Sequence, residues 1–466
     1  MNKEPSRKEL ELASRQTTWG SIYVVTFLLG LLGVQMSIYF TSTWQYLSES
    51  DPTASVDFFG AVIAISALAC AFANPLFGLW SQRSGSIKNP VMCAFGFGAL
   101  GNLIYGFAHL FPPYVKWLIL LGRFFTGFTP GSLGVLRSFV GTASTKEDRV
   151  RAVSISNAGF TAGFFLGPTF QICFMPIGKT GWQVGLLHFN MYTVCALFMF
   201  CISSVSVLVT KIILVEDYVD PFFVLPKFDR LPVAFLFYSW WLLCGIVCVE
   251  SLSAPVTIAL FNWDLEDAVL YNGIIETVCC IVTTIVNISI ASTSLRYIDN
   301  RKLMLFGLSV FGIFCVLHLP LPFYPGPLDR PANGTNGSCD FDWCDWTPRI
   351  PIVLFCFMYA FLLGIAFPFV SAGANALLSQ VVGPRRQGVV QGLFAFTGSF
   401  SQFVVSLFST RLFDFSGYVW ILTYHLAVIV IAILSLLVLW NRLVPLKLTP
   451  EEGKPTKYKR GTFYRL

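Results

Sequence analysis

The chain has 466 residues, of which 55% are hydrophobic and only 12% are charged. Because soluble proteins carry about 25% charged residues, this composition excludes an ordinary globular protein and indicates a polytopic protein of the lipid bilayer. The net charge of +6 argues against a nucleic-acid partner, since the basic residues lie in short loops rather than in one patch. No apolar segment with a cleavage site follows the polar N-terminus, so we predict no removable signal peptide.

Twelve apolar runs that are long enough to cross a membrane follow one another along the chain. They lie near 19–43, 58–80, 90–110, 115–140, 152–175, 186–212, 232–261, 268–293, 302–322, 350–375, 387–411 and 418–441. Span four and its basic turn resemble span ten and its basic turn, and the longest cytosolic linker falls between spans six and seven. We therefore predict an all-α membrane protein whose twelve transmembrane helices form two six-helix halves.

Basic residues predict the orientation, because cytosolic loops carry an excess of Lys and Arg. These residues gather in one set of loops and at both ends of the chain, whereas the opposite loops are acidic. Both termini are therefore expected in the cytosol. The expected order is a cytosolic tail 1–18, an N-terminal half 19–213, a cytosolic linker 214–231, a C-terminal half 232–443 with a luminal loop 323–350, and a cytosolic tail 444–466.

The luminal loop contains two N-glycosylation sequons, at Asn333 and Asn336, and two cysteines, Cys339 and Cys344. We predict that at least one asparagine is glycosylated, which makes the protein a glycoprotein. An oxidising lumen would also allow the two cysteines to form a disulfide. The alternative is that one sequon is unused and both thiols are free.

From Trp117 onward, span four carries Arg123 and Arg137 in an otherwise uncharged run. A charge within a span costs about 2.5–3.5 kcal/mol on insertion scales, so it usually lines a cavity or pairs inside the bundle. On one straight helix the two arginines would lie within about 40° of one face and about 21 Å apart. Both are candidate binding groups for an anion. Alternatively, Arg123 is a hydrogen-bonded strut, and Arg137 snorkels or pairs with a loop carboxylate such as Glu147 or Asp148.

Two carboxylates lie within spans, Glu250 in span seven and Glu276 in the luminal half of span eight. Removal from water favours the neutral acid, whereas a nearby arginine favours the carboxylate. A group that responds in this way suits a proton carrier, so both are candidate ion-binding residues. The alternatives are a structural ion pair for Glu250 and a water-facing or structural role for Glu276.

Span five contains Gly159, Gly163 and Gly167 at a spacing of four, followed by Pro168. Glycines at this spacing leave one helix face bare, so a neighbouring helix can pack closely or slide against it. Pro255 and Pro368 predict bends in spans seven and ten. No metal-ligand spacing, nucleotide loop or nucleophile–base pair is present, so we expect no metal, no cofactor and no enzymatic activity.

Three motifs resemble those of the major facilitator superfamily. The loop Gly78–Gly85 with its Arg83 resembles the family's loop signature, although Ser81 stands where an acidic residue is usual. The pattern Arg123-x-x-x-Gly127 resembles the span-four motif, and Gly159–Pro168 resembles the span-five motif of antiporters. Further stretches resemble an endolysosomal branch of the superfamily: Asp51–Ala54, Leu76–Ser81, Gly167–Phe174, Asn190–Thr193 and Ala268–Ile274.

This resemblance implies a lysosomal or late endosomal membrane protein that moves chloride or another small solute by alternating access between its halves. The positive excess in the first half indicates an anionic solute, and Glu250 and Arg123 are expected to border the central cavity, which would allow coupling to protons. A chloride channel on the same fold remains an alternative, as does a membrane scaffold or receptor that transports nothing. We expect a monomer.

Overall fold

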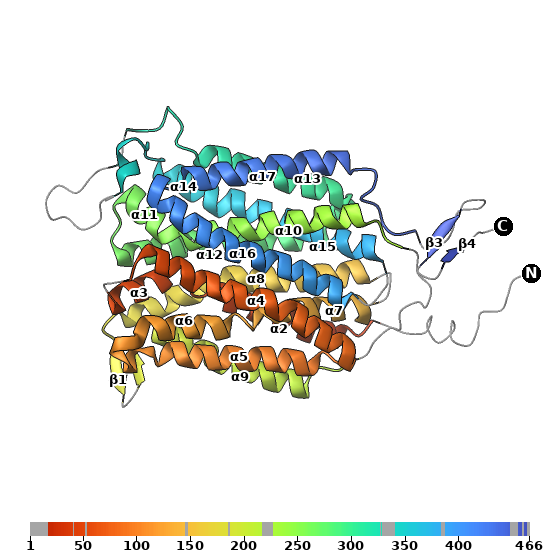
Figure 1. The fold of residues 1–466 in the computed structure, drawn as a ribbon, viewed down its shortest axis with the longest axis horizontal. Coiled ribbons are helices and arrows are strands. Elements are labelled where there is room, and N and C mark those ends of the chain that lie inside the picture. Colours follow the sequence, from red (N-terminus) through yellow and green to blue (C-terminus); the bar gives the residue numbers. More distant parts are fainter. Residues whose placement is uncertain are drawn as a thin grey trace, which may run out of the picture.

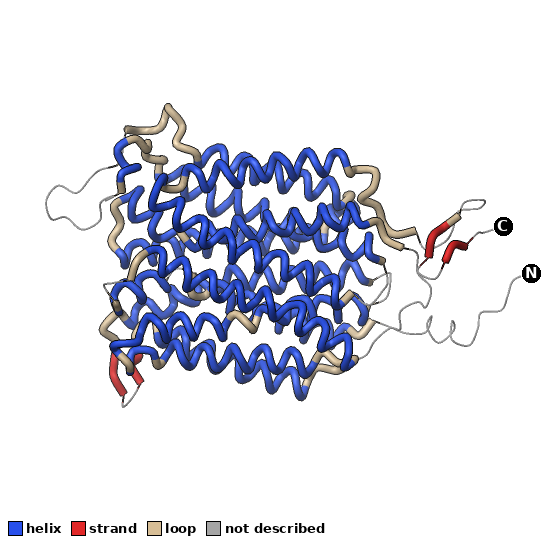
Figure 2. The backbone as a smooth tube through the Cα atoms, viewed as in Figure 1, coloured by secondary structure: helices blue, strands red, loops and turns tan. Residues whose placement is uncertain are grey.

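The computed structural model describes residues 17–40, 42–51, 54–144, 148–184, 187–216, 227–326, 328, 341–383, 387–447, 455–458 and 461–463. Within these ranges the molecule is a bundle of long, roughly parallel helices (Figure 1 and Figure 2). Two short antiparallel hairpins lie outside the bundle, one pairing β1 (Trp182–Val184) with β2 (Leu187–Phe189), the other β3 (Thr456–Tyr458) with β4 (Gly461–Phe463).

The first half is built from the helices that precede the middle linker. These are α2 (Trp19–Ser37), α3 (Thr43–Ser50), α4 (Val56–Ser84), α5 (Lys88–Gly106), α6 (Val115–Thr126), α7 (Leu133–Ala143), α8 (Arg149–Phe174) and α9 (Thr193–Ile212). Short 3-10 turns join them: η1 (Ala108–Leu110), η2 (Pro112–Tyr114), η3 (Pro130–Ser132) and η4 (Met175–Ile177).

The second half repeats this plan after the linker. Its helices are α10 (Arg230–Ser251), α11 (Ser253–Phe261), α12 (Leu265–Ser292), α13 (Asn300–His318), α14 (Ile352–Phe357), α15 (Gly364–Val382), α16 (Gly388–Ser416) and α17 (Val419–Val438). The 3-10 turns η5 (Ser294–Tyr297) and η6 (Asp342–Asp345) lie in its loops, and a π-helical turn, η7 (Met358–Leu363), joins α14 to α15.

The prediction of twelve spans in two halves is confirmed. In the described part of the chain, ten helices are long and apolar enough to cross a membrane. The helix α5 and the pair α10–α11 complete the set of twelve. Long apolar runs are read reliably from sequence because backbone groups in lipid must be satisfied within the segment, which leaves the helix as the available form.

The expectation that Arg123 and Arg137 share one straight helix is wrong. Span four consists of α6 and α7, which are separated by the 3-10 turn η3 that begins at Pro130. A proline has no N–H to donate, and its ring clashes with the carbonyl four residues earlier, so the α-helix stops before it. The two arginines consequently lie on different helices, and the angle and distance worked out for one straight helix do not apply.

Other departures from regular helices also occur at spans that contain proline. The break between α10 and α11 falls at Leu252, three residues before Pro255. Pro368 lies inside α15, one turn after the π-helical turn η7. The predicted start of span six at 186 is wrong, because residues 187–189 form β2 and α9 begins only at Thr193.

The bundle has two distinct ends. At one end, which we call the terminal end, Thr17 Oγ1 donates a hydrogen bond to Asp148 Oδ2 (2.7 Å), and Lys227 N donates to Lys457 O (3.1 Å). Figure 1 shows β3 and β4 at this end and α3, α11 and α14 at the other. At that opposite end Lys179 Nζ lies 2.9 Å from Glu49 Oε1 and 3.3 Å from Glu266 Oε1, so it links the two halves.

The halves meet along two seams, α4 against α16 and α8 against α12. Cys70 Sγ of α4 lies 2.9 Å from Ser399 Oγ of α16. Thr169 Oγ1 of α8 lies 2.9 Å from Thr277 Oγ1 of α12. Small and hydroxylic residues such as these are typical of close helix–helix contacts within a membrane. The seams position the side chains between them, where the candidate site lies.

Candidate functional site

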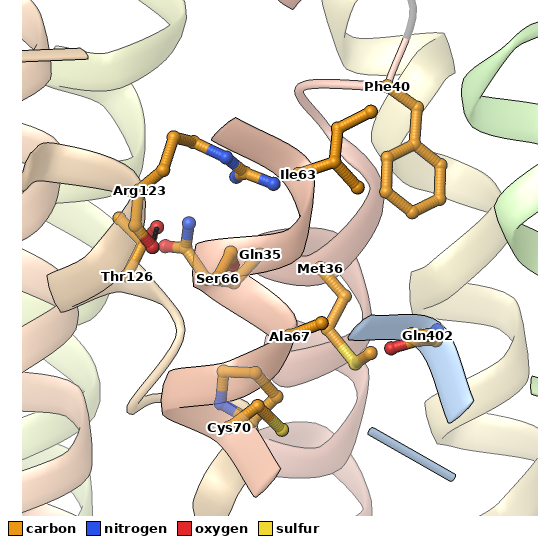
Figure 3. Close-up of a pocket in the computed structure, with 11 residues that line it drawn as sticks. Gln35, Met36, Phe40, Ile63, Ser66, Ala67, Cys70, Arg123, Thr126 and Gln402 are labelled. Carbon is orange, nitrogen blue, oxygen red and sulfur yellow. Dashed lines mark hydrogen bonds between the residues drawn. The ribbon is translucent and has the colours of Figure 1, made fainter. Parts of the chain in front are cut away.

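A pocket between the halves contains the guanidinium of Arg123 (Figure 3). The lining residues come from the region of α2, from α4, from α6 and η3, and from α16: Gln35, Met36, Phe40, Ile63, Ser66, Ala67, Cys70, Arg123, Thr126, Pro130 and Gln402. The free volume, including the open mouth, is about 460 Å³. Figure 3 shows Arg123 reaching from α6 toward Ile63 of α4, with Gln402 entering from α16.

Arg123 is held in this position by an aromatic ring. Its Cζ lies 5.0 Å from the ring centroid of Tyr39, and the arginine is only 4% exposed. Tyr39 Oη in turn donates a hydrogen bond to Asn102 Oδ1 (2.7 Å), and Asn102 Nδ2 donates to Gln35 Oε1 (2.7 Å). A cation over an aromatic face gains roughly 0.5–2 kcal/mol, depending on how far it is desolvated. The network therefore orients the cation, and Tyr39, Asn102 and Gln35 bring no carboxylate to compensate its charge.

The electrostatic character of the pocket is positive. Among the residues that line it in the described part of the chain, Arg123 is the charged one and none is a carboxylate. Arg123 Nε is buried and has no hydrogen-bond partner among the described residues. Burying a charge without a partner is costly, so this arrangement favours a ligand that brings a negative charge and hydrogen-bond acceptors.

Arg137 occupies a second pocket nearer the terminal end, and it is 9% exposed. Its Cζ lies 5.3 Å from the ring centroid of Phe160 and 5.1 Å from that of Trp240. The expected alternative of a partner at Asp148 is not seen, because the three guanidinium nitrogens have no hydrogen-bond partner in the described part of the chain. Glu147, the other expected partner, lies outside the described residues.

The two candidate carboxylates are placed differently by the structure. Glu250 lies in the last turn of α10, beside the break at Leu252, and its side chain is outside the part that the structure describes. The expected approach of Glu250 to Arg123 therefore stays a prediction. Glu276 lies on α12 and is 8% exposed. No ion pair joins it to Arg123 within the described residues.

Glu276 belongs to a stripe of buried polar residues on α12. Asn272, one turn earlier, donates to Thr257 Oγ1 of α11 (2.8 Å). Thr283, two turns later, donates to the Gly364 carbonyl oxygen of α15 (3.1 Å). The carboxylate thus faces the interior of the second half rather than lipid.

The glycines of α8 face α2 at close range. A Cβ at Gly159 would lie 2.5 Å from Thr26 Cγ2, one at Gly163 would lie 1.9 Å from Gly30 O, and one at Gly167 would lie 2.1 Å from Ser37 Oγ. Pro168 follows inside the same helix. Since Cβ contacts under 3.0 Å essentially do not occur, no side chain fits at these three positions without moving a neighbour.

Two further motif glycines, Gly127 and Gly78, also lie at helix crossings. A Cβ at Gly127 would lie 2.2 Å from Ser66 O of α4, and one at Gly78 would lie 3.1 Å from Gly388 O of α16. Gly78 is therefore part of the seam between the halves at the terminal end. Arg83 is exposed in the last turn of α4 at the same end.

The predicted modification sites fall in the loop after α13. Asn333, Asn336 and Cys339 lie outside the described residues. Cys344 is fully buried in η6 and is disulfide-bonded. The identity of its partner stays a prediction.

Several functional candidates were missed by sequence reasoning, namely Gln35, Tyr39, Asn102, Phe160, Trp240 and Gln402. Each is a single amide or aromatic residue inside an apolar run, where tyrosine, phenylalanine and tryptophan are common. Their pairing joins helices far apart in sequence, as in the Gln35–Asn102 pair. No spacing rule along one helix could have found it.

Comparison with known proteins decides the family. A sequence profile described as Major Facilitator Superfamily matches residues 18–329. The chain belongs to the major facilitator superfamily. Major facilitator superfamily domain-containing protein 8 of Xenopus laevis is 26% identical over 478 aligned positions, which cover 92% of both chains. A class D tetracycline resistance protein of Salmonella ordonez is 27% identical over 31% of this chain and 35% of its own.

A solved structure supports the same superfamily fold. The crystal structure of the human organic anion transporter MFSD10 (TETRAN) aligns with a TM-score of 0.57, covering 90% of this chain and 99% of that one. The two share 12% identity, so this likeness concerns the fold alone. The expectation of a multi-pass superfamily transporter rather than an enzyme is thus confirmed.

Proposed function

We propose that this superfamily member moves a small anionic solute across an endolysosomal membrane by alternating access between its halves. The observation that carries the proposal is the guanidinium of Arg123, buried between the halves in a pocket whose described lining has no carboxylate. An arginine presents five N–H donors in a planar fork that suits carboxylates and similar anions. The pocket is lined by α4 and α6 of the first half and by Gln402 of the second, so a solute bound there contacts both.

Chloride is the smallest candidate, and a monocarboxylate is the smallest organic one. The organic anions named for MFSD10 agree with this charge preference, although that likeness carries no residue-level argument. The endolysosomal location rests on the resemblance of stretches such as Gly167–Phe174 to that branch of the superfamily. With both termini in the cytosol, as the basic loops predict, the terminal end faces the cytosol and the opposite end faces the acidic lumen.

Proton coupling would operate through Glu250. An ionised Glu250 and a bound anion would compete for the charge of Arg123, so anion binding would favour protonation of the carboxylate. The proton and the anion would then travel in the same direction. Glu276 is a second candidate proton carrier, because it is buried in α12 without an ion-pair partner among the described residues.

The test uses purified protein in liposomes, with chloride and a monocarboxylate as probes and with or without a pH gradient. Charged hydrogen bonds contribute about 1.5–3 kcal/mol, so Arg123→Gln should lower anion flux by about ten- to 150-fold. Arg123→Lys should restore only part of it, because a point charge does not reproduce the planar fork. The matched control is Arg411→Gln, which makes the same chemical change at a side chain that is 79% exposed.

Three outcomes would overturn the proposal. Equal flux in Arg123→Gln and Arg411→Gln would show that the buried cation is a strut. Macroscopic currents that reverse at the chloride potential, without stoichiometric proton movement, would show a chloride channel instead of a carrier. A protein that carries no flux with any anion would be a scaffold or receptor.

A further inference from the structure

A second anion site is indicated by Arg137. Its three guanidinium nitrogens are buried and have no hydrogen-bond partner among the described residues. Each buried donor left unpaired costs about 1–3 kcal/mol, and more when the group is charged. The rings of Phe160 and Trp240 offset part of this cost, but they accept none of the five N–H groups in the plane of the guanidinium.

Arg301 is a useful comparison, because it is a structural arginine that combines ring stacking with hydrogen bonds. It also stacks on an aromatic ring, with its Cζ 5.0 Å from the centroid of Trp440. Its guanidinium nevertheless donates to both carboxylate oxygens of Asp299 and to the carbonyl oxygen of Trp440. Stacking therefore does not replace hydrogen bonding at Arg301, whereas the residues that the structure describes offer Arg137 ring contacts and no hydrogen bond.

The pocket around Arg137 has a largely polar lining, which suits a polar ligand. Besides apolar residues, it is lined by Ser156 and Asn157 of α8, Asn375 and Ser379 of α15, Gln387 and Gln391. None of the described lining residues is a carboxylate. The free volume, including the mouth, is about 340 Å³. The amide nitrogens of Asn375 and Gln391 donate to Ser371 O and Gln387 Oε1, and each keeps a second N–H that an anion could accept beside the cation.

The two halves share this pocket. Arg137 and Asn157 belong to the first half, and Asn375 and Gln391 belong to the second. The ring clamp is shared as well, since Phe160 lies on α8 and Trp240 on α10. An anion bound here would contact both halves near the terminal end, so separating the halves at that end would dismantle the site.

We propose that Arg137, Asn157 and the amides of the second half form a second binding site for a small monovalent anion, a halide or a monocarboxylate, distinct from the pocket of Arg123. Occupancy of this site stabilises the arrangement in which the halves are closed at the terminal end. The inference does not require transport, because it concerns equilibrium binding to one arrangement of the protein.

Iodide is the probe, because it quenches tryptophan fluorescence and Trp240 already contacts Arg137. Purified protein in nanodiscs is titrated with iodide against gluconate at constant ionic strength. The fluorescence of Trp240 is obtained by subtracting the fluorescence of a Trp240→Phe variant from that of the otherwise identical protein that keeps Trp240. In the wild type, the quenching of this difference signal by iodide should saturate. In Arg137→Gln its half-saturation concentration should rise at least tenfold, and in Arg137→Lys it should rise by a smaller factor.

Arg123→Gln is the matched control, since it removes the other buried arginine and should leave the Trp240 signal within twofold. A failure of the transport proposal would therefore not change this result. If Arg137→Gln does not purify as a monodisperse protein, Asn157→Leu fills the pocket without removing the charge and should likewise raise the half-saturation concentration at least tenfold. Quenching of Trp240 that rises linearly in the wild type, or that saturates unchanged in Arg137→Gln or Asn157→Leu, would overturn the proposal.

Discussion

Replacing Gly163 tests whether the contact between α2 and α8 is needed for function. A Cβ at this position would lie 1.9 Å from Gly30 O, 2.6 Å from Gly30 C and 2.8 Å from Gly30 Cα. All three atoms belong to the backbone of α2, so no side-chain rotation can relieve the clash. Ordinary van der Waals contact begins at 3.4 Å, so the helices must separate locally by about 1.5 Å.

This displacement should inactivate the protein without preventing its insertion. Insertion depends on total hydrophobicity, which leucine raises. Overpacking a core with side-chain atoms costs about 1–3 kcal/mol, and a clash with backbone atoms should cost more. We expect Gly163→Leu to lose at least tenfold in anion flux at equal membrane abundance. Because the first carbon already clashes, Gly163→Ala should also fall well below the wild type.

The assay compares flux per inserted molecule in liposomes, with the melting temperature of the purified protein as a second readout. Gly96→Leu is the matched control, because a Cβ at Gly96 would meet no atom within 4 Å. It makes the same change inside a span and should leave flux and melting temperature near the wild-type values. Wild-type flux and stability in Gly163→Ala would refute the argument, since the close approach would then be dispensable.

The remaining predictions concern the proton and the luminal loop. Glu250→Gln imitates the protonated acid, so it should keep anion flux but lose the dependence of that flux on luminal pH. A wild-type profile in Glu250→Gln would make Glu250 a structural residue. Asn333→Gln combined with Asn336→Gln should abolish the mobility shift that a glycosidase produces. A mobility that is insensitive to glycosidase in the parent protein would contradict the luminal assignment.

The architecture was predictable because its signal lies in the chemistry of single segments. A run of about 20 apolar residues is enough to identify a span, and twelve such runs with a long middle linker indicate two halves. The break at Pro130 was not anticipated, although the residue was visible, because a proline inside a span can either kink the helix or end it. Neighbouring helices decide between these outcomes by supplying partners for the freed carbonyl groups.

The candidate site was only half predictable. Arg123 and Arg137 stand out in the sequence because a charge in an apolar run is rare. Their surroundings do not, because Tyr39 and Trp240 are brought to them by packing between helices that lie far apart along the chain. Sequence spacing could suggest a loop carboxylate as a partner for Arg137, and only the fold places that guanidinium between two aromatic rings instead.

The two arginines also bear on how a solute could cross the molecule. A glutamine in place of either arginine would avoid the cost of a buried charge, and this cost is the reason why we propose that each arginine binds an anion. Arg123 lies in the pocket between the halves, and Arg137 lies nearer the terminal end. An anion that left the first pocket in that direction would meet the second positive charge before it reached water. The seam where Gly78 meets Gly388 closes that same end. Opening it would separate the halves that share the Arg137 pocket, so release of the anion and opening of the seam would be one event.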